Sequence, residues 1–356
     1  MPARGRARVH PRKRGLTAVV VSVGSALVMV AAASGWLLTG YINSQLHRVN
    51  ADTSQAGPSG PVNILLAGVD VRSGLTRREK RVLHVGSSTG QNSDTLMLAH
   101  VSADHRHISV VSLPRDSWVR IPGHGMNKIN AAFGLGGPAL MVRTVEAATG
   151  MTINDFVEVN FLGFVKIIDA LGGVDICLPY AVNDHYTGLH MSAGLHHVNG
   201  ITALKFARDR HSFATSDLAR IGDQQQLLSS VLSEAISSGT LTNPVKFSKF
   251  LTAVTAATKV DQSFNVTGLA DELRFIRPSA VTFTTVPLAS TNYLAPNGEL
   301  AVLWNHAKAA ALFARIKSDR PAVHHHGRHH RVHSGQPTVW QVKSRTAAQA
   351  ACRSKH

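Results

Sequence analysis

Apolar residues between about residues 62 and 290 fall into short runs that alternate with helical stripes. Strand-like runs occur at 62–66, 94–101, 108–113, 156–161, 174–178 and 281–286. Helix-like stretches, with apolar residues at three- and four-residue spacing, occur at 138–149, 164–171, 200–207, 216–237 and 269–276. This alternation predicts an α/β domain over 62–290 with three α/β/α layers, in which helices pack on both faces of a central mixed sheet.

Turn and capping residues separate these elements. Residues 102–107 join two apolar runs and predict a hairpin, and Pro114 ends the second strand because it has no N–H to donate. Pro138 is suited to a helix start and Gly150 to a helix end. Ser216 and Asp217 can cap the long helix that follows them.

The first 40 residues follow a different pattern. Residues 1–15 are basic, whereas 16–40 hold no charged residue and are long enough to span a bilayer, which takes roughly 20 apolar residues. Trp36 and Tyr41 lie at the far end, where aromatic rings favour the interface. The pattern predicts a single-pass protein of the cell membrane, with a cytoplasmic N-terminus (1–15), a transmembrane helix (16–40) and an extracellular main domain. A cleaved signal peptide is the alternative.

The segments that flank the domain are polar. Residues 41–61 are rich in Ser, Gly and Pro and predict a flexible linker. Residues 291–318 are interpreted as a C-terminal helical extension, and 319–356 as a disordered, His-rich basic tail. The tail histidines could bind Zn²⁺ or Ni²⁺, but without fixed geometry a solvated tail is the simpler interpretation.

The net charge of +16 resides mainly in the two ends of the chain. Residues 1–14 carry six positive charges and 320–356 carry seven, with no acidic residue in either segment. Only +3 remains for everything between them, and no nucleic-acid-binding motif occurs. We therefore expect no nucleic-acid partner.

The chain has two cysteines, Cys177 and Cys352. Cys177 lies in a strand-like run and is most simply a small core residue, whereas Cys352 lies in the polar tail. A bridge between them remains an alternative, since disulfides persist outside the cell.

Several charged residues and one amide stand beside apolar strands or near helix ends. They are Asp70, Arg72, Asp94, Arg115, Arg208, Arg210, Arg220 and Gln224. Each of them alone would be an ordinary surface or capping residue. Arg220 and Gln224 are one helical turn apart, so both could reach one ligand. As a set they suit a polyanionic phosphate, held by guanidinium groups and bridged to carboxylates by a hard cation.

The order of these short motifs resembles the LytR–CpsA–Psr family of membrane-anchored cell-wall proteins. The resemblance covers roughly 62–290 and includes Val-Ser-Leu-Pro-Arg-Asp-Ser (111–117) and Ala-Leu-Lys-Phe-Ala-Arg-Asp-Arg (203–210). The other blocks are 63–72, 93–98, 128–133, 163–174, 193–200 and 217–221. Each block is weak alone, and their shared order carries the resemblance.

The resemblance implies a Mg²⁺-dependent phosphotransferase. It would move a glycopolymer from a polyprenyl-pyrophosphate carrier onto a sugar hydroxyl of peptidoglycan. Arg115, Arg208 and Arg220 would hold the pyrophosphate, supported by Arg72, Arg210 and Gln224. Asp70 and Asp94 would bind Mg²⁺ and, with Arg115, form the catalytic group. No general base is assigned.

The chain departs from the family pattern at two positions. Asn92 and Asp223 stand where the family often has arginine. Losing two cations would weaken a phosphate clamp. This keeps one alternative open, a non-catalytic polyprenyl-phosphate-binding regulator of cell-wall assembly. A hydrolase that uses water as the acceptor is a third interpretation.

Overall fold

The computed structural model describes residues 44–55, 60–69, 76–83, 93–178, 181–209, 216–237, 240, 243–265, 276–322 and 345–346. The chain divides into two units, residues 1–45 and 46–356, and every element named below belongs to the second. The predicted membrane helix over 16–40 lies outside the described residues. Within the described ranges, no helix combines the length and the apolar character needed to cross a membrane.

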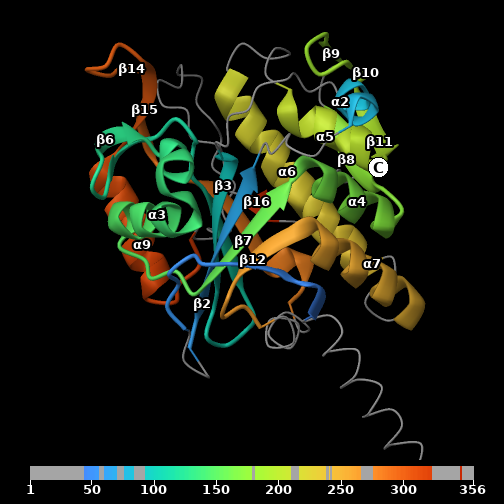
Figure 1. The fold of residues 1–356 in the computed structure, drawn as a ribbon, viewed down its shortest axis with the longest axis horizontal. Coiled ribbons are helices and arrows are strands. Elements are labelled where there is room, and N and C mark those ends of the chain that lie inside the picture. Colours follow the sequence, from blue (N-terminus) through green and yellow to red (C-terminus); the bar gives the residue numbers. More distant parts are fainter. Residues whose placement is uncertain are drawn as a thin grey trace, which may run out of the picture. The chain divides into compact units, whose positions relative to one another are not determined.

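The second unit is built on a mixed sheet (Figure 1). Its eight strands among the described residues follow the order β1–β12–β7–β2–β3–β4–β13–β16. In chain order they are β1 (His47–Val49), β2 (Val62–Val69), β3 (Ser93–Val101), β4 (Ile108–Ser112), β7 (Asp155–Asn160), β12 (Thr258–Asp261), β13 (Val281–Thr285) and β16 (Arg345–Thr346). Strand β3 runs antiparallel between β2 and β4, so β2, β4 and β7 all end at one edge of the sheet, where β3 begins. The prediction of a mixed sheet is confirmed.

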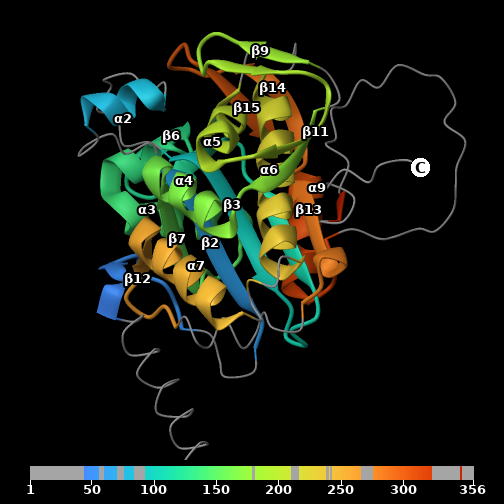
Figure 2. The same cartoon turned by 90° about the vertical axis from the view of Figure 1, so that its right-hand side faces the viewer.

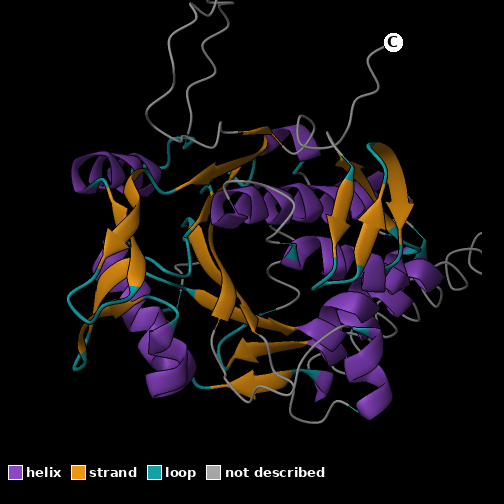
Figure 3. Ribbon diagram, turned by 90° about the horizontal axis from the view of Figure 1, so that it is seen from above, coloured by secondary structure: helices purple, strands orange, loops and turns teal. Residues whose placement is uncertain are grey.

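Helices cover both faces of this sheet, as Figures 1 and 3 show. On one face, α3 (Ala131–Thr149) and α9 (His306–Lys317) pack against Leu65, Ala67 and Val69 of β2. On the other face, Ile64 belongs to a cluster that reaches α6 (Ser216–Ser237). Alternate residues of β2 therefore serve opposite layers, as the pleat of a strand requires.

Three further helices share the α6 side of the sheet (Figure 2). They are α4 (Phe161–Leu171), α5 (Gly200–Arg208) and α7 (Pro244–Ala257). Close packing among them depends on glycine, because a Cβ on Gly163 would lie 2.5 Å from the carbonyl oxygen of Ala257. A Cβ on Gly200 would lie 2.3 Å from the carbonyl oxygen of Val165. Larger side chains at these positions would force the helices apart.

Two-stranded antiparallel pairs extend from the sheet and its helices. They pair β5 (Trp118–Ile121) with β6 (Gly125–Lys128), β8 (Val174–Leu178) with β11 (Gly194–Val198), β9 (Val182–Asp184) with β10 (Leu189–Met191), and β14 (Leu288–Leu294) with β15 (Leu300–Trp304). The short helices are α2 (Arg77–Val82) and the 3₁₀ turn η1 (Pro278–Ala280).

The flanking segments contain more regular structure than their composition indicates. Residues 47–49, inside the predicted linker, form β1, which adds to the sheet because Leu46 and Ala51 are buried on either side of it. The predicted helical extension over 291–318 holds for α9, but its first part forms the β14–β15 hairpin, which turns at Asn297 and Gly298. In the predicted tail, 345–346 form β16, and Ala322 donates its N–H to Ser109.

Two helix predictions also change. The predicted loop over 73–92 contains α2, whose first turn is held by a capping box between Thr76 and Glu79. The predicted helix over 138–149 is the second part of α3, which begins at Ala131 and is interrupted by non-helical Gly136 and Gly137. The predicted helix over 269–276 falls almost wholly outside the described residues.

Cys177 is disulfide-bonded, and the interpretation of this residue as a free core cysteine is wrong. Cys352 is the one other cysteine in the sequence and lies outside the described residues.

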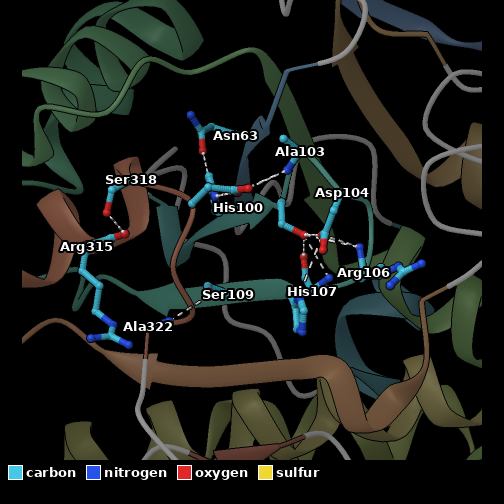
Figure 4. Close-up of polar contacts among 12 residues, drawn as sticks. Asn63, His100, Ala103, Asp104, Arg106, His107, Ser109, Arg315, Ser318 and Ala322 are labelled. Carbon is cyan, nitrogen blue, oxygen red and sulfur yellow. Dashed lines mark hydrogen bonds and ion pairs between the residues drawn. The ribbon is translucent and has the colours of Figure 1, made fainter.

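A buried polar network holds the edge of the sheet opposite to the ends of β2 and β4 (Figure 4). His100 contacts Asn63 Oδ1 through Nδ1 at 2.7 Å and Asp319 Oδ1 through Nε2 at 3.1 Å. Asp319 also accepts the N–H of Ala103. Burial lowers the pKa of His100, and the hydrogen bond to Asp319 offsets part of that effect. The network fastens the end of α9 to β3.

Candidate functional site

A cavity of about 460 Å³ lies between the sheet and the layer formed by α4, α5 and α6. Its lining changes along the strands. Where β2 and β7 end, the lining is polar and includes Gly68, Asp94, Asn160, Arg208, Arg220 and Gln224. Farther from this edge it is apolar and includes Leu66, Met97, Phe164, Ile167, Leu227, Leu228 and Val231. The cavity is therefore suited to an amphiphilic molecule with an anionic head.

The polar end is formed first by the tight pairing of β2 and β3. Gly68 lies opposite Thr95, and a Cβ on Gly68 would come within 3.0 Å of the Thr95 Cβ. This close approach places Asp94, the second residue of β3, at the mouth of the cavity. Antiparallel β3 thus brings a carboxylate from a strand start to the edge where its neighbours end.

Arg115 follows the end of β4 and reaches the same edge. Its Nη1 donates to Asp94 Oδ1 at 2.5 Å, and its Nε donates to Asp116 Oδ2 at 3.3 Å. The Arg115 side chain is 19% exposed. It contacts a residue that lines the cavity without lining the cavity itself. The carboxylates of Asp94 and Asp116 therefore hold the Arg115 guanidinium behind Asp94, next to the cavity lining.

Arg208 and Arg220 come to the cavity from two helices. Arg208, the last residue of α5, donates from Nη1 to the carbonyl oxygen of Leu83 at 2.9 Å, and its guanidinium carbon lies 5.1 Å from the centre of the Phe161 ring. Arg220, in the second turn of α6, borders the cavity although only 4% of the residue is exposed. Two cations on opposing helices thus face one space.

Gln224 and its neighbour have different tasks. Gln224 lines the cavity one turn after Arg220, as their spacing indicates, and its Nε2 donates to the carbonyl oxygen of Ala207 at 3.4 Å. Gln225 is buried and points to the sheet, where its amide donates to Ser112 Oγ at 2.9 Å and to the Thr284 carbonyl at 3.1 Å. Gln225 fixes the position of α6, and Gln224 faces the ligand space.

The structure therefore brings Asp94, Arg208, Arg220 and Gln224 to one cavity, with Arg115 bound to Asp94. The other predicted site residues, Asp70, Arg72 and Arg210, lie outside the described residues, as does Asn92. The roles given to all of these residues stay predictions.

Asp223 of α6, which does not line the cavity but precedes Gln224, is an unusual acid. Its Oδ2 is buried and makes no hydrogen bond. Burial, with a smaller contribution from the charge of Asp209, raises the pKa of Asp223 to about 8. At the position where the family often has arginine, α6 thus carries a carboxyl group that is mostly protonated at pH 7. This group adds no positive charge, and little negative charge, beside Arg220.

A divalent cation is compatible with the donor at the mouth. Asp94 offers carboxylate oxygens, the type of ligand that Mg²⁺ prefers, and its side chain is 27% exposed. Among the residues that the structure describes, no three His, Cys, Asp or Glu side chains gather as a metal-binding group. Mg²⁺ commonly uses one or two carboxylates together with phosphate oxygens and water, so Asp94 fits as one such ligand.

Several lining residues were not found from the sequence. Phe161, Phe164 and Leu204 form apolar wall, and they had been assigned only as helix or strand residues. Tyr186 and Thr187 come from the β9–β10 hairpin, a segment without a strand signal in the sequence because Val182 to Met191 mixes apolar, His and Gly positions. Nothing local distinguishes Tyr186 before the hairpin is placed beside α5.

Comparison with known proteins identifies relatives over most of the chain. The model of the LytR_cpsA_psr family matches residues 40–317. The cell wall biosynthesis protein LcpA of Corynebacterium glutamicum is 31% identical over 341 residues, and the probable cell wall biosynthesis protein LcpB of the same organism is 35% identical over 306 residues. Each match covers 85% of this chain, but 65% of LcpA and 71% of LcpB. The chain thus spans about two thirds of the length of LcpA.

A shorter match has a more specific name. The polyisoprenyl-teichoic acid–peptidoglycan teichoic acid transferase TagU of Oceanobacillus iheyensis is 36% identical over 187 residues, which are 51% of this chain and 53% of TagU.

Solved structures share the fold. The LytR-Csp2A-Psr enzyme from Actinomyces oris superposes with a TM-score of 0.61 at 23% identity and covers 76% of this chain and 95% of its own. TagV of B. subtilis gives a TM-score of 0.60 at 24% identity and covers 73% of this chain and 97% of its own.

Proposed function

The chain belongs to the LytR–CpsA–Psr family, and from that premise we propose that it transfers a glycopolymer from a polyprenyl-pyrophosphate carrier to a sugar hydroxyl of peptidoglycan. The observation that carries the proposal is the graded cavity, which has cations at the strand ends and an apolar interior. A prenyl chain is stabilised by apolar burial, and a pyrophosphate by guanidinium groups. The names of TagU and the Lcp relatives support the same class of reaction.

The chemistry is a transfer of a glycosyl-bearing phosphoryl group. The oxygen of the acceptor hydroxyl bonds to the phosphorus that carries the sugar, and the hydroxyl proton is released to solvent. The bond between that phosphorus and the bridging oxygen breaks, and prenyl phosphate leaves with the bond's electron pair. Arg208 and Arg220 line the space where the negative charge of the pyrophosphate would lie. Such a transfer depends mainly on positioning and charge stabilisation.

Arg115 and Asp94 have linked tasks in this proposal. Asp94 would hold Mg²⁺ together with Asp70, and the bound ion would supply charge neutralisation at the phosphate oxygens. Arg115 holds Asp94 in place through the 2.5 Å contact and adds positive charge behind the mouth. Asp116 in turn orients Arg115 from its other side.

The proposal includes a place in the cell. Residues 16–40 would anchor the chain in the cell membrane with the N-terminus in the cytoplasm, and residues 46–356 would face the cell wall. An extracellular location agrees with the disulfide bond of Cys177, since such bonds are rare in the cytoplasm. Protease digestion of intact protoplasts tests this, because an outward-facing domain is degraded while the cytosolic markers survive.

The test of the activity uses the full chain in detergent. It is incubated with a prenyl-pyrophosphoryl oligosaccharide, peptidoglycan fragments and Mg²⁺, and a phosphodiester-linked product is sought by mass spectrometry. Arg115→Ala should reduce turnover by about 100- to 1,000-fold, the range seen when one charge-stabilising donor is removed. Arg143→Ala, an exposed arginine of α3 on the other face of the sheet, is the matched control and should react normally.

The lipid part of the proposal has its own variant pair. Val231→Trp fills the apolar end of the cavity and should abolish carrier binding, whereas Val245→Trp, at an exposed position of α7, should not. No product from wild type, together with normal carrier binding by Val231→Trp, would refute the transferase and its proposed pocket.

A second function is favoured by one observation. Asp223 places a buried carboxyl beside Asp209 where the family has a cation, so the phosphate grip is weaker than in the family pattern. The chain would then be a non-catalytic binder of prenyl phosphate that regulates wall assembly. Carrier binding without turnover, unchanged by Asp94→Ala, would support this function over transfer.

A further inference from the structure

Tyr186 stands at the mouth of the cavity with its side chain in solvent. It lines the cavity, yet 74% of the residue is exposed. Among the large apolar and aromatic side chains exposed in the described ranges, it is the one aromatic residue. Folded proteins normally cover much of a tyrosine ring, so an exposed ring beside a binding cavity is suited to contact with a ligand.

The turn that carries Tyr186 is held firmly. Asp184, which is 1% exposed, accepts the N–H of Tyr186 at 2.9 Å and the hydroxyl of Thr187 at 2.9 Å. Lys205 Nζ of α5 donates to the carbonyl oxygen of Gly188 at 3.2 Å. Leu189 is buried in the core cluster beneath the hairpin. The exposed ring is therefore presented on a fixed support.

The turn lies at the phosphate end of the cavity. Lys205, which binds the turn, precedes Arg208 by three residues on α5, so the turn and the Arg208 guanidinium share one wall. Figures 1 and 2 place the β9–β10 hairpin at the same end of the second unit as α2. A ligand whose phosphates lie between Arg208 and Arg220 would present its next group, on the solvent side, near Tyr186.

We propose that Tyr186 is a specificity-determining residue, whose ring stacks on the first sugar of the donor, the pyranose esterified to the pyrophosphate. This inference rests on the proposed function and extends it to the recognition of the sugar. A pyranose has a face of C–H groups that packs on an aromatic ring, and a rim of hydroxyls that stays in water. The exposed position of Tyr186 suits this kind of contact, because the ring can cover one sugar face while the hydroxyls stay solvated.

The test compares two probes on the full chain in detergent. One is geranylgeranyl pyrophosphate, and the other is the same pyrophosphate esterified to one N-acetylglucosamine. Tyr186→Ala should raise the Kd of the sugar-bearing probe by about five- to tenfold, the size of one aromatic stacking contact, and leave the Kd of the sugar-free probe unchanged. Tyr186→Phe should behave as wild type because it keeps the ring. Leu195→Ala, at an exposed position on β11, is the control and should change neither Kd.

Three results would overturn the inference while the proposed function stands. They are an equal loss for both probes, no loss for either, or unchanged donor binding with a raised KM for peptidoglycan, which would assign the ring to the acceptor. If wild type binds neither probe, the proposed function itself fails. A melting temperature of Tyr186→Ala equal to that of wild type excludes misfolding as the cause of a loss.

Discussion

Asp223→Asn tests the electrostatics of α6 through the pH dependence of stability. Burial, aided by the charge of Asp209, raises the pKa of Asp223 from 3.8 to about 8. Between these values the folded chain keeps a proton that the unfolded chain has lost, so stability falls as the pH rises. The contribution of Asp223 to stability is complete below pH 3.8 and is lost once the pH has risen through about 8.

The structure sets the size of this effect. The interval from 3.8 to about 8 corresponds to at most roughly 6 kcal/mol, at about 1.36 kcal/mol per pKa unit. Asp223 Oδ2 is buried, but the residue as a whole is partly exposed. Solvent screening of that exposed part reduces the expected loss to about 1–3 kcal/mol. For a domain of this size that is a change in Tm of about 3–10 °C.

The assay is thermal unfolding of the full chain in detergent from pH 5 to pH 9, followed by the fluorescence of buried Trp118 and Trp304. Asp223→Asn has no proton to lose, so its Tm relative to that of wild type should rise from pH 5 to pH 9 and exceed it most at pH 9. Asp52→Asn, at an exposed position, should follow wild type throughout. Parallel curves for wild type and Asp223→Asn across the range would refute the reasoning.

Three further predictions concern the body of the domain. Lys259→Met leaves the buried Glu158 carboxylate without its 2.8 Å partner and should cost about 3–5 kcal/mol in chemical denaturation, and adding Glu158→Gln should recover most of it. Gly163→Ala places a Cβ 2.5 Å from the Ala257 carbonyl and should cost about 1–3 kcal/mol by overpacking, with unfolding by urea as the measurement; a loss below 0.5 kcal/mol, roughly the effect of a neutral surface change, would contradict the packing described. Reduction of the Cys177 disulfide should lower Tm by an amount equivalent to about 2–5 kcal/mol, and reductant should leave the melting of a Cys177→Ser variant unchanged.

The elements that sequence patterns predicted are those with long, regular signals. The helix over 216–237 was predicted from apolar residues at helical spacing, and β3 from the continuous apolar run that a strand buried on both faces requires. Strand β1 was missed because a three-residue edge strand has no pattern of its own and forms only where β12 offers an unpaired side. The β14–β15 hairpin was missed because β14 has no regular alternation of polar and apolar residues, and because each strand leaves a leucine exposed, Leu294 and Leu300.

The candidate site also contains residues that the sequence could predict and residues that it could not. Arg208, Arg220 and Gln224 could be proposed from helix ends and one-turn spacing, and they do share a cavity. Asp223 was visible as a departure from the family pattern, but its raised pKa arises from its burial in the folded chain and, to a smaller extent, from the charge of Asp209 at the end of α5. Tyr186 could not be predicted, since its importance arises only from the docking of a hairpin beside α5.

The pairing of edge strand β1 with β12 has a practical consequence for shortened forms of this protein. Strand β1 precedes the domain that composition marks out, and Arg48 Nη1 donates to the carbonyl oxygen of Gln262 at 2.7 Å beyond the end of β12. A fragment that begins near residue 58 lacks β1. The N–H and C=O groups on the outer side of β12 are then unpaired and can pair with another molecule. We expect such fragments to self-associate, and those that begin before residue 46 to remain monodisperse in size-exclusion chromatography.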